Sequence, residues 1–238
     1  MELFDIPVVV RRWAMDSASP FSPTPRTELH RIPARGSYDR AVIAAILDEA
    51  LYCHVGFVDG GQPVVIPTIH ARIGDELVFH GARASRLLRA LAGPVCVTVT
   101  LLDGLVLARS AFHHSMNYRS VVVLGVAEEV TDPERKLAAL DAIVEHVAVG
   151  RAGIARPANR KELAATRVMS LPLREASAKI RTGPPLDEPE DLAYPCWAGV
   201  VPLRTAPGEP ISAPDLTGDF TPPGAADFAR GRGDSQSG

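Results

Sequence analysis

The chain has 238 residues, of which 46% are hydrophobic and 22% are charged, and its formal net charge at pH 7 is -3. This composition supports a substantial apolar core and excludes a wholly disordered chain. Because the charge balance is slightly negative, no basic excess drives binding to nucleic acid or to an anionic membrane surface, and neither is expected as a partner.

The lengths of the apolar runs and the number of cysteines indicate whether the protein is expected in a membrane, outside the cell or in the cytoplasm. The longest apolar run, Val121–Ala127, has the length of a strand and falls far short of the roughly 20 residues of a membrane helix. The first residues lack the pattern of an export signal. The cysteines, Cys53, Cys96 and Cys196, are far apart and odd in number, which is typical of reduced thiols. We therefore expect a soluble cytoplasmic protein.

The two ends of the chain differ from its middle. Residues 1–33 are turn-rich and are predicted to form an extended arm outside the core. Residues 205–238 contain five prolines and several glycines and are predicted to be poorly ordered. The adhesion-like tripeptide Arg232-Gly233-Asp234 in this tail is attributed to chance. Residues 34–204 are predicted to form one folded domain.

The folded part begins with a helix and then changes to the period of strands. Ser37 is the predicted N-cap of a helix with one apolar face, formed by Val42, Ile43, Ile46, Leu47 and Ala50. Strands bounded by glycine-containing turns are predicted at 52–58, 63–71 and 76–80. A short helix over 85–92 follows and is closed by Gly93-Pro94.

In the second half of the domain, Asp103-Gly104 is the strongest hairpin signal, and it is predicted to join strands 95–102 and 105–109. The remaining predicted elements are a long strand over 118–130, a helix from Pro133 to Val147, a helix over 161–166 and a strand over 168–173. Because hairpins dominate, we predict a mainly β fold with flanking helices, in which antiparallel strands form a closed or nearly closed barrel.

Residues 79–86 combine the features of an anion site. A strand ends at His80, small residues leave the backbone uncovered, and Ser85 opens a helix beside Arg83 and Arg86. Amide donors at a helix N-terminus and guanidinium groups attract a phosphate. The alternative is an ordinary capped surface helix with solvated arginines.

The strand before this segment contains Pro67, which cannot donate to a strand ladder. The strand is therefore predicted to be bulged or to lie at a sheet edge. An exposed edge offers amides and carbonyls to a planar heterocycle; the alternative is an edge that proline simply protects.

Four segments together resemble the split-barrel flavin-binding proteins related to pyridoxamine 5'-phosphate oxidase, in the branch of nitroimidazole-resistance and flavin-nucleotide-binding proteins. They are 60–67, 79–86, 117–125 and 195–202, and they occur in the family's order. The resemblance covers roughly 34–203. It implies a six-stranded antiparallel split β-barrel, the FMN-binding split barrel, forming a homodimer with one FMN at each end of the interface.

The resemblance also implies how the phosphate of the flavin is held. By this analogy Ser85 and Arg86 bind the phosphate, and Arg83 is a weaker candidate. His80 matches a histidine of the nitroimidazole-resistance branch and is a candidate contact to the flavin or the substrate. The alternative for His80 is a half-buried histidine bonded to the backbone at a strand end.

The rest of the flavin is assigned by the same analogy. Ile66, Thr68 and His70 would lie along the isoalloxazine ring and the ribityl chain. Trp197 matches the family's C-terminal tryptophan, which approaches the flavin from the partner subunit.

The sequence departs from the oxidase in its substrate site. The phosphate-binding arginine and lysine of the family's second strand are replaced by residues such as Val64 and His70, and no arginine–histidine pair for pyridoxal phosphate is seen. No nucleophile elbow, zinc-protease motif or P-loop occurs. Because a flavin carries the redox chemistry itself, no catalytic side chain is required or assigned. We predict an FMN-dependent oxidoreductase acting on a small organic molecule.

Two alternatives stay open. One is a protein that binds or stores a flavin or haem without turnover, in which His54, His80 or His114 could be an axial ligand of the iron. The other is a reductase that uses the deazaflavin F420. The neighbours His113 and His114 would point to opposite faces of a strand and could not easily share one metal ion, so no metal-ion site is predicted.

Overall fold

The computed structural model describes residues 19–224 and residue 228. The first part of the predicted N-terminal arm and the end of the predicted tail, with Arg232-Gly233-Asp234, lie outside the described residues. Within residues 19–33, Phe21 differs from the prediction because it is buried in the core, where the guanidinium of Arg40 lies 4.0 Å from the centre of its ring. Residues 205–224 are exposed throughout.

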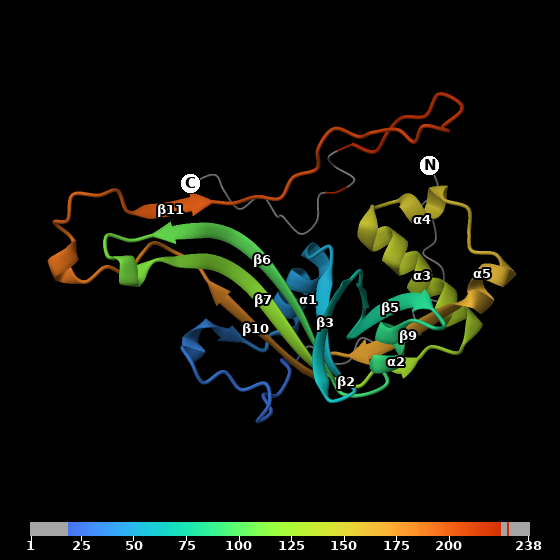
Figure 1. Cartoon of the computed structure of the whole chain (residues 1–238), viewed down its shortest axis with the longest axis horizontal. Helices are drawn as coiled ribbons and strands as arrows, with labels where there is room; N and C mark the ends of the chain where they lie inside the picture. Colours follow the sequence, from blue (N-terminus) through green and yellow to red (C-terminus); the bar gives the residue numbers. More distant parts are fainter. Residues whose placement is uncertain (1–18, 225–227, 229–238) are drawn as a thin grey trace.

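The described strands form two antiparallel sheets (Figure 1). The larger sheet has the order β1-β10-β7-β6-β2-β3, and β11 pairs with β6 beyond this path. Its strands are β1 (Gly36–Ser37), β2 (Cys53–Asp59), β3 (Gln62–Thr68), β6 (Val95–Leu107), β7 (Ser115–Gly125), β10 (Glu175–Arg181) and β11 (Gly199–Pro202). The smaller sheet, of order β4-β5-β9-β8, contains β4 (Ala71–Ile73), β5 (Glu76–Ala82), β8 (Glu128–Glu129) and β9 (Thr166–Pro172).

Helices and single turns connect these strands. The helices are α1 (Arg40–Glu49), α2 (Arg86–Ala90), α3 (Pro133–Val147), α4 (Arg151–Ile154) and α5 (Arg160–Ala165). The 3-10 turns are η2 (Pro33–Arg35), η3 (Ala111–His113) and η4 (Pro189–Asp191). Over the described residues, no helix is both long enough and apolar enough to cross a bilayer.

One apolar core lies between the two sheets. Strand β6 alternates, as a half-buried strand should, with Val95, Val97 and Val99 facing inward. Phe79 of β5 and Leu171 of β9 enter the same core from the smaller sheet. The mainly β, antiparallel split-barrel prediction is confirmed. In the described part of the chain no strand pairing joins the two sheets, so the barrel is not closed.

Helix α3 covers the other face of the smaller sheet (Figure 1). Its Ala139 and Ile143 pack against Val78 of β5 and Val168 of β9. The helical spacing predicted for this segment is therefore confirmed, and its apolar face serves the packing of the fold.

Two boundaries near the start of the domain differ from the prediction. Asp39, not Ser37, caps α1, because its carboxylate accepts a hydrogen bond from the amide of Val42 at 3.0 Å. The strand predicted over 63–71 is divided between the sheets, since β3 ends at Thr68 and β4 begins at Ala71.

The predicted hairpin turn at Asp103-Gly104 is wrong. Strand β6 continues through it with a bulge between Leu102 and Gly104, and β6 pairs with β7. The Asp103 carboxylate accepts from Nη2 of Arg119 at 2.7 Å. A side-chain carbon at Gly104 would lie 3.0 Å from the carbonyl oxygen of Val201 in β11. The glycine is therefore needed for the close approach of another strand, and the chain reverses later, at η3.

The long strand predicted over 118–130 is also divided. Strand β7 ends at Gly125, where an added side-chain carbon would lie 2.9 Å from Cδ1 of Leu171. The amide of Ala127 then donates to the carbonyl of Leu91 at 2.8 Å, and β8 joins the smaller sheet. Strands β10 and β11 and helix α4 were not predicted.

Candidate functional site

The predicted phosphate-binding residues lie together between β5 and α2. Helix α2 begins at Arg86 and has five residues, fewer than predicted. The hydroxyl of Ser85 accepts from the amide of Leu88 at 3.4 Å, so it already caps this helix. Because Ser85 already occupies one of the amides at the start of the helix, the arginine side chains are the main groups that could bind an anion here.

Arg86 reaches the turn between β2 and β3. Its Nε donates to Oδ2 of Asp59 at 2.5 Å, and the side chains of the pair are 53% and 50% exposed. The guanidinium also lies 6.0 Å from the centre of the Phe57 ring. This contact with Asp59 uses Nε, which leaves the two terminal amino groups of Arg86 as donors for an anion.

His80 and Arg83 complete this segment, which we call the β5–α2 corner (residues 80–86). Arg83 is exposed. His80 lies near the end of β5, opposite Val168 of β9, and its side chain is exposed rather than half-buried. Partial burial lowers the pKa of His80 below its ordinary value. The corner thus offers two guanidinium groups and one imidazole.

Strand β3 is an edge strand of the larger sheet, as predicted from Pro67. Pro67 stands opposite His54 of β2. The candidates Ile66 and Thr68 lie on β3 and are half-buried. Asp59, the partner of Arg86, is the last residue of β2 and pairs with Gln62 of β3. The β5–α2 corner therefore lies at the turn end of the β2–β3 hairpin, and Thr68 lies at its other end.

His70 is placed differently from the other candidates. Its ring is fully buried, and Nε2 lies 3.0 Å from the carbonyl oxygen of Leu47. The ring centre is 4.8 Å from that of His146, whose Nε2 lies 2.9 Å from the carbonyl oxygen of Ala50. Both histidines therefore bind carbonyls at the C-terminal end of α1 and dock α3 against it.

Trp197 lies on a projection that we call the arm, formed by residues 102–118 and 182–203. The arm extends from one side of the molecule, while α2 lies well away from it (Figure 1). Trp197 is 64% exposed and lies two residues before β11. A side-chain carbon at Gly199 would lie 2.8 Å from Cζ2 of the Trp197 ring, so the ring rests on the glycine backbone. Within one chain the structure does not bring Trp197 to the β5–α2 corner.

An ion pair fixes the end of the arm. The amide and Nη1 of Arg109 donate to the carboxylate of Asp187 at 2.8 and 2.9 Å. The side chain of Asp187 is only 2% exposed. Burial acts to raise the pKa of Asp187, but the hydrogen bonds from Arg109 outweigh it and hold the pKa below its usual range. The loop after β10 is thereby attached to the tip of the β6–β7 hairpin.

A second ionic cluster lies where the arm leaves the body. Arg119 of β7 binds both carboxylate oxygens of Glu49 in α1 and both of Asp103 in β6. The side-chain hydrogen bonds to Glu49 and Asp103 raise the pKa of Arg119 above its ordinary value. Arg119 therefore makes an ion-pair network within the chain.

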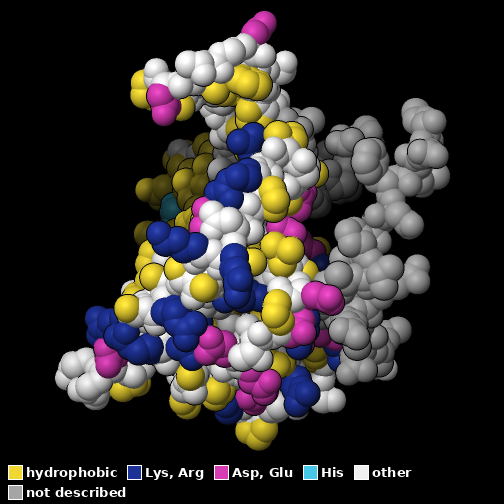
Figure 2. Space-filling view, turned by 90° about the vertical axis from the view of Figure 1, so that its right-hand side faces the viewer, with side chains coloured by type: hydrophobic (Ala, Val, Ile, Leu, Met, Phe, Trp, Pro, Cys, Tyr) yellow, Lys and Arg dark blue, Asp and Glu magenta, His cyan; other side chains and the backbone are white. Residues whose placement is uncertain are grey.

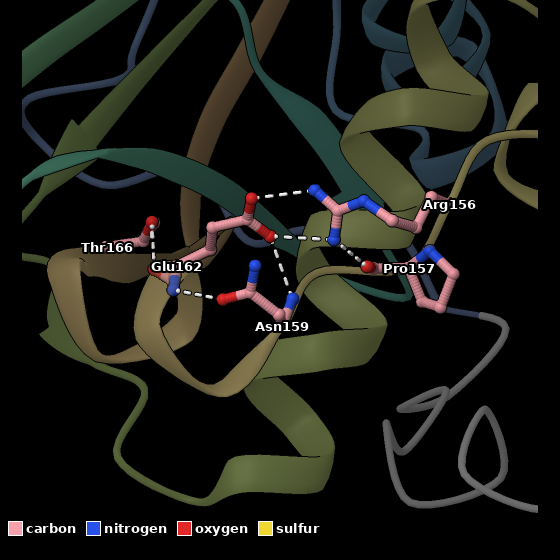
Figure 3. Close-up of polar contacts among 5 residues, drawn as sticks. All are labelled: Arg156, Pro157, Asn159, Glu162 and Thr166. Atoms are coloured by element: carbon pink, nitrogen blue, oxygen red, sulfur yellow. Dashed lines mark hydrogen bonds and ion pairs between the residues drawn. The ribbon is translucent and has the colours of Figure 1, made fainter.

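The surface around α4 and α5 also carries ionic groups that serve the fold. Basic and acidic side chains lie side by side on this face of the molecule (Figure 2). Glu162 accepts from Arg156 at 2.7 Å and from the amide of Asn159 at 2.8 Å, and Asn159 caps α5 in return (Figure 3). This network closes the loop before α5. In residues 19–224 and 228 no group of three histidine, cysteine or acidic side chains could hold a metal ion.

The cysteines differ in their environment, and we expect them to differ in reactivity. Cys196 is exposed, whereas burial raises the pKa of Cys53 to about 12 and also raises the pKa of Cys96. Because the thiolate is the nucleophile, iodoacetamide at mildly alkaline pH should label Cys196 first and Cys53 only after unfolding. Peptide mass spectrometry after timed labelling checks this order, and rapid labelling of Cys53 in the native protein would contradict it.

Comparisons with known proteins bear on these features. The family model described as pyridoxamine 5'-phosphate oxidase matches residues 39–180. The flavocytochrome Anf3 from Azotobacter vinelandii is 43% identical, with a TM-score of 0.80, and the match covers 86% of this chain and 96% of that chain. The comparison with curated proteins found no match.

Two further solved structures are similar. The FAD and haem binding protein from Mycobacterium smegmatis is 40% identical with a TM-score of 0.76, over 81% of this chain and 95% of that chain. A candidate 5-nitroimidazole antibiotic resistance protein from Bacteroides thetaiotaomicron is 25% identical with a TM-score of 0.53, over 61% of this chain and 86% of that chain.

Proposed function

The chain belongs to the pyridoxamine 5'-phosphate oxidase family, and we propose that it is a flavin-binding redox protein acting on a small organic molecule. The observation that carries this proposal is the β5–α2 corner, which brings together Arg83, Arg86 and His80 and in which Arg86 binds Asp59 at the turn end of the β2–β3 hairpin. When bound, the flavin would supply the hydride or electron transfer. The side chains described above would bind and orient it.

In this proposal each part of the corner has a separate task. The terminal amino groups of Arg86 bind the flavin phosphate, with Arg83 as a second cation and Ser85 holding the start of α2. Ile66 and Thr68 on β3 border the ring and the ribityl chain. The carboxylate of Asp59 opposes the phosphate electrostatically, so it sets a limit on the affinity.

The flavin is FMN or its adenylated form, FAD. The sequence resemblance suggested FMN, whereas a relative that is 40% identical is named for binding FAD. We therefore expect FAD, which shares with FMN the phosphate that the β5–α2 corner would hold.

We also propose that two copies of the chain complete each flavin site. One support is that the arm, which carries Trp197, lies well away from α2 within one chain (Figure 1). The other is that the arm has exposed apolar side chains. The arm of one copy would carry Trp197 to the flavin of the other. The three free cysteines support a reducing, cytoplasmic location.

Haem is a second candidate ligand. The relatives that are 43% and 40% identical are named a flavocytochrome and an FAD and haem binding protein. This chain would then bind both groups. A protein that stores or senses them without turnover is the alternative to an enzyme.

An absorption spectrum of the purified protein tests the proposal, with mass identification of whatever heat releases. We expect a flavin spectrum that NADH, NADPH or dithionite bleaches and that an acceptor restores. A bound flavin that only dithionite reduces would favour a carrier over an enzyme using a nicotinamide donor. A protein that stays colourless and binds neither FMN nor FAD in excess would overturn the proposal, and uptake of F420 alone would replace the flavin by the deazaflavin.

A further inference from the structure

Three positively charged side chains gather where the loop before β1 meets the end of β10. Strands β1 and β10 pair with Gly36 opposite Lys179, so Arg35, the residue before β1, is placed beside the last residues of β10. The last of these is Arg181. The ammonium of Lys179 donates to the carbonyl oxygen of Arg31, in the same loop, at 2.9 Å. We call Arg35, Lys179 and Arg181 the basic cluster.

Arg181 is the buried member of this cluster, at 5% exposed, and its hydrogen bonds go to neutral oxygens. The guanidinium donates to the side-chain oxygen of Asn117 and, at 3.3 Å in each case, to the carbonyl oxygens of Gly183 and Pro184. These bonds satisfy N–H donors, but neutral oxygens do not cancel the charge. A buried arginine is normally paired with an opposite charge, because removing a lone cation from water is costly.

The neighbours of Arg181 do not supply that opposite charge. Burial lowers the pKa of Arg181, and the positive charge of Arg35 lowers it further, while Tyr118, opposite Arg181 on β7, acts in the other direction. Across residues 19–224 and 228, no member of the basic cluster forms an ion pair with a carboxylate. The folded chain therefore leaves three cations together without an anion.

The other two members of the cluster are accessible from solvent. Arg35 and Lys179 are half-buried. The backbone that carries Arg35 is strained, because Ile32 has a φ of 54°, a left-handed conformation that β-branched residues rarely adopt. The carbonyl of Ile32 accepts from the amide of Arg35 at 3.0 Å, so this conformation fixes the turn that presents Arg35.

Within one chain the basic cluster is separate from the proposed flavin site. In the strand order of the larger sheet, β1 and β10 stand at one end and β3 stands at the other. Strand β10 ends near the arm, whereas α2 lies on the other side of the molecule (Figure 1). The flavin proposed for the β5–α2 corner therefore does not neutralise these cations in the same chain.

We propose that the basic cluster binds a phosphate group, either free or carried by a small molecule other than the flavin. The ammonium of Lys179 and the guanidinium of Arg35 would donate to the phosphate oxygens, and the anion would supply the charge that Arg181 lacks. A phosphate ester carries about -1.5 to -2 charges at neutral pH, so it balances several cations better than one carboxylate does. This inference goes beyond the proposed function and does not depend on it.

Isothermal titration calorimetry of the flavin-loaded protein tests the assignment, with inorganic phosphate and glycerol 3-phosphate as probes at low chloride. We expect the wild type to bind phosphate, and Arg35→Gln and Lys179→Gln to bind it roughly tenfold more weakly. Binding of both probes would support a phosphate ester as the ligand, and binding of inorganic phosphate alone would support the free ion. The flavin content, measured in the same samples, should not change.

Arg174→Gln is the matched control, because it removes the same charge from an exposed side chain just before the other end of β10. It should bind phosphate as the wild type does. Equal weakening in Arg174→Gln would show a response to net charge alone and would overturn the site. So would the absence of phosphate binding by the wild type, or wild-type affinity in both cluster variants.

Flavin measurements separate this inference from the proposed function. Loss of flavin from Arg35→Gln and Lys179→Gln would assign these cations to the flavin of a second copy of the chain, and would overturn a separate site. A wild-type protein that binds phosphate through Arg35 and Lys179 but holds no flavin would overturn the proposed function and leave the phosphate site standing.

Discussion

Replacing Arg86 by alanine is expected to weaken flavin binding by roughly 10- to 150-fold. The expectation follows from a charge-assisted hydrogen bond to phosphate, which contributes about 1.5–3 kcal/mol. Arg86 is suited to this contact because its bond to Asp59 uses Nε and leaves both terminal amino groups. Fluorescence quenching of FMN and FAD by the apoprotein measures the two affinities directly.

Arg89 supplies the matched control on the same helix. Its side chain donates to the carbonyl oxygen of Ala84 within the chain, so Arg89→Ala removes an equal charge without removing the proposed phosphate ligand. That variant should bind flavin nearly as tightly as the wild type. Asp59→Asn should bind at least as tightly, because it removes the opposing carboxylate. Equal affinity in Arg86→Ala and the wild type would place the phosphate elsewhere.

Local patterns in the sequence were enough to predict the body of the fold. Alternation of Val95, Val97 and Val99 marks a strand with one buried face, and the same alternation is seen in β2. The residues of the β5–α2 corner are consecutive in the chain, so the sequence alone could place them together. The alternation of a strand and the residues of the β5–α2 corner can each be recognised within a few consecutive residues.

Long-range contacts explain the errors. Asp103-Gly104 has the composition of a tight turn, but Arg119 takes the carboxylate and β11 requires the glycine. Both partners are distant in sequence, so no local pattern could reveal them. Strand β10 contains the small buried residues Ala176, Ser177 and Ala178 in succession, which conceals the alternation of a strand.

The candidate site was predictable only in part for the same reason. The burial of His70 depends on its packing against α1 and His146, which lie far from it in the sequence. From the sequence, His113 and His114 were not expected to share a metal ion, because neighbouring side chains on a strand point to opposite faces. That argument could not show what each ring contacts in the folded protein. In the folded arm the ring of His114 contacts the carbonyl oxygen of Ser110, and the ring of His113 lies near the carboxylate of Glu188.

Replacing Arg119 by alanine is expected to destabilise the protein by about 2 kcal/mol, less than for a fully buried ion pair because the cluster is partly solvated. The side chain is 29% exposed, and its partners Glu49 and Asp103 are 14% and 34% exposed. Its removal leaves two carboxylates close together without a cation. Urea denaturation of the flavin-free protein measures the change in the free energy of unfolding. As a control, Arg156→Ala removes an exposed surface ion pair and should change this free energy little.

The pH dependence separates this mechanism from lost packing. Because the folded protein raises the pKa of Arg119, its contribution is present at every pH below the ordinary arginine pKa and is lost only above it. The deficit of Arg119→Ala should therefore be constant between about pH 6 and 10, and should shrink in acid as the two carboxylates become protonated. Glu49→Gln in the Arg119→Ala background should restore part of the stability.

The same substitution should also loosen the arm. Asp103 holds β11 through its carbonyl, which accepts from the amide of Leu203 at 3.0 Å, and its carboxylate is fixed by Arg119. Amide hydrogen exchange in 199–203 should accelerate in Arg119→Ala more than exchange in β2, which pairs with β6 over Val95–Thr98. An equal deficit at all pH values and unchanged exchange in β11 would show that Arg119 acts by packing alone. In that case the ion pairs of Arg119 with Glu49 and Asp103 would not be what holds the arm to the rest of the protein.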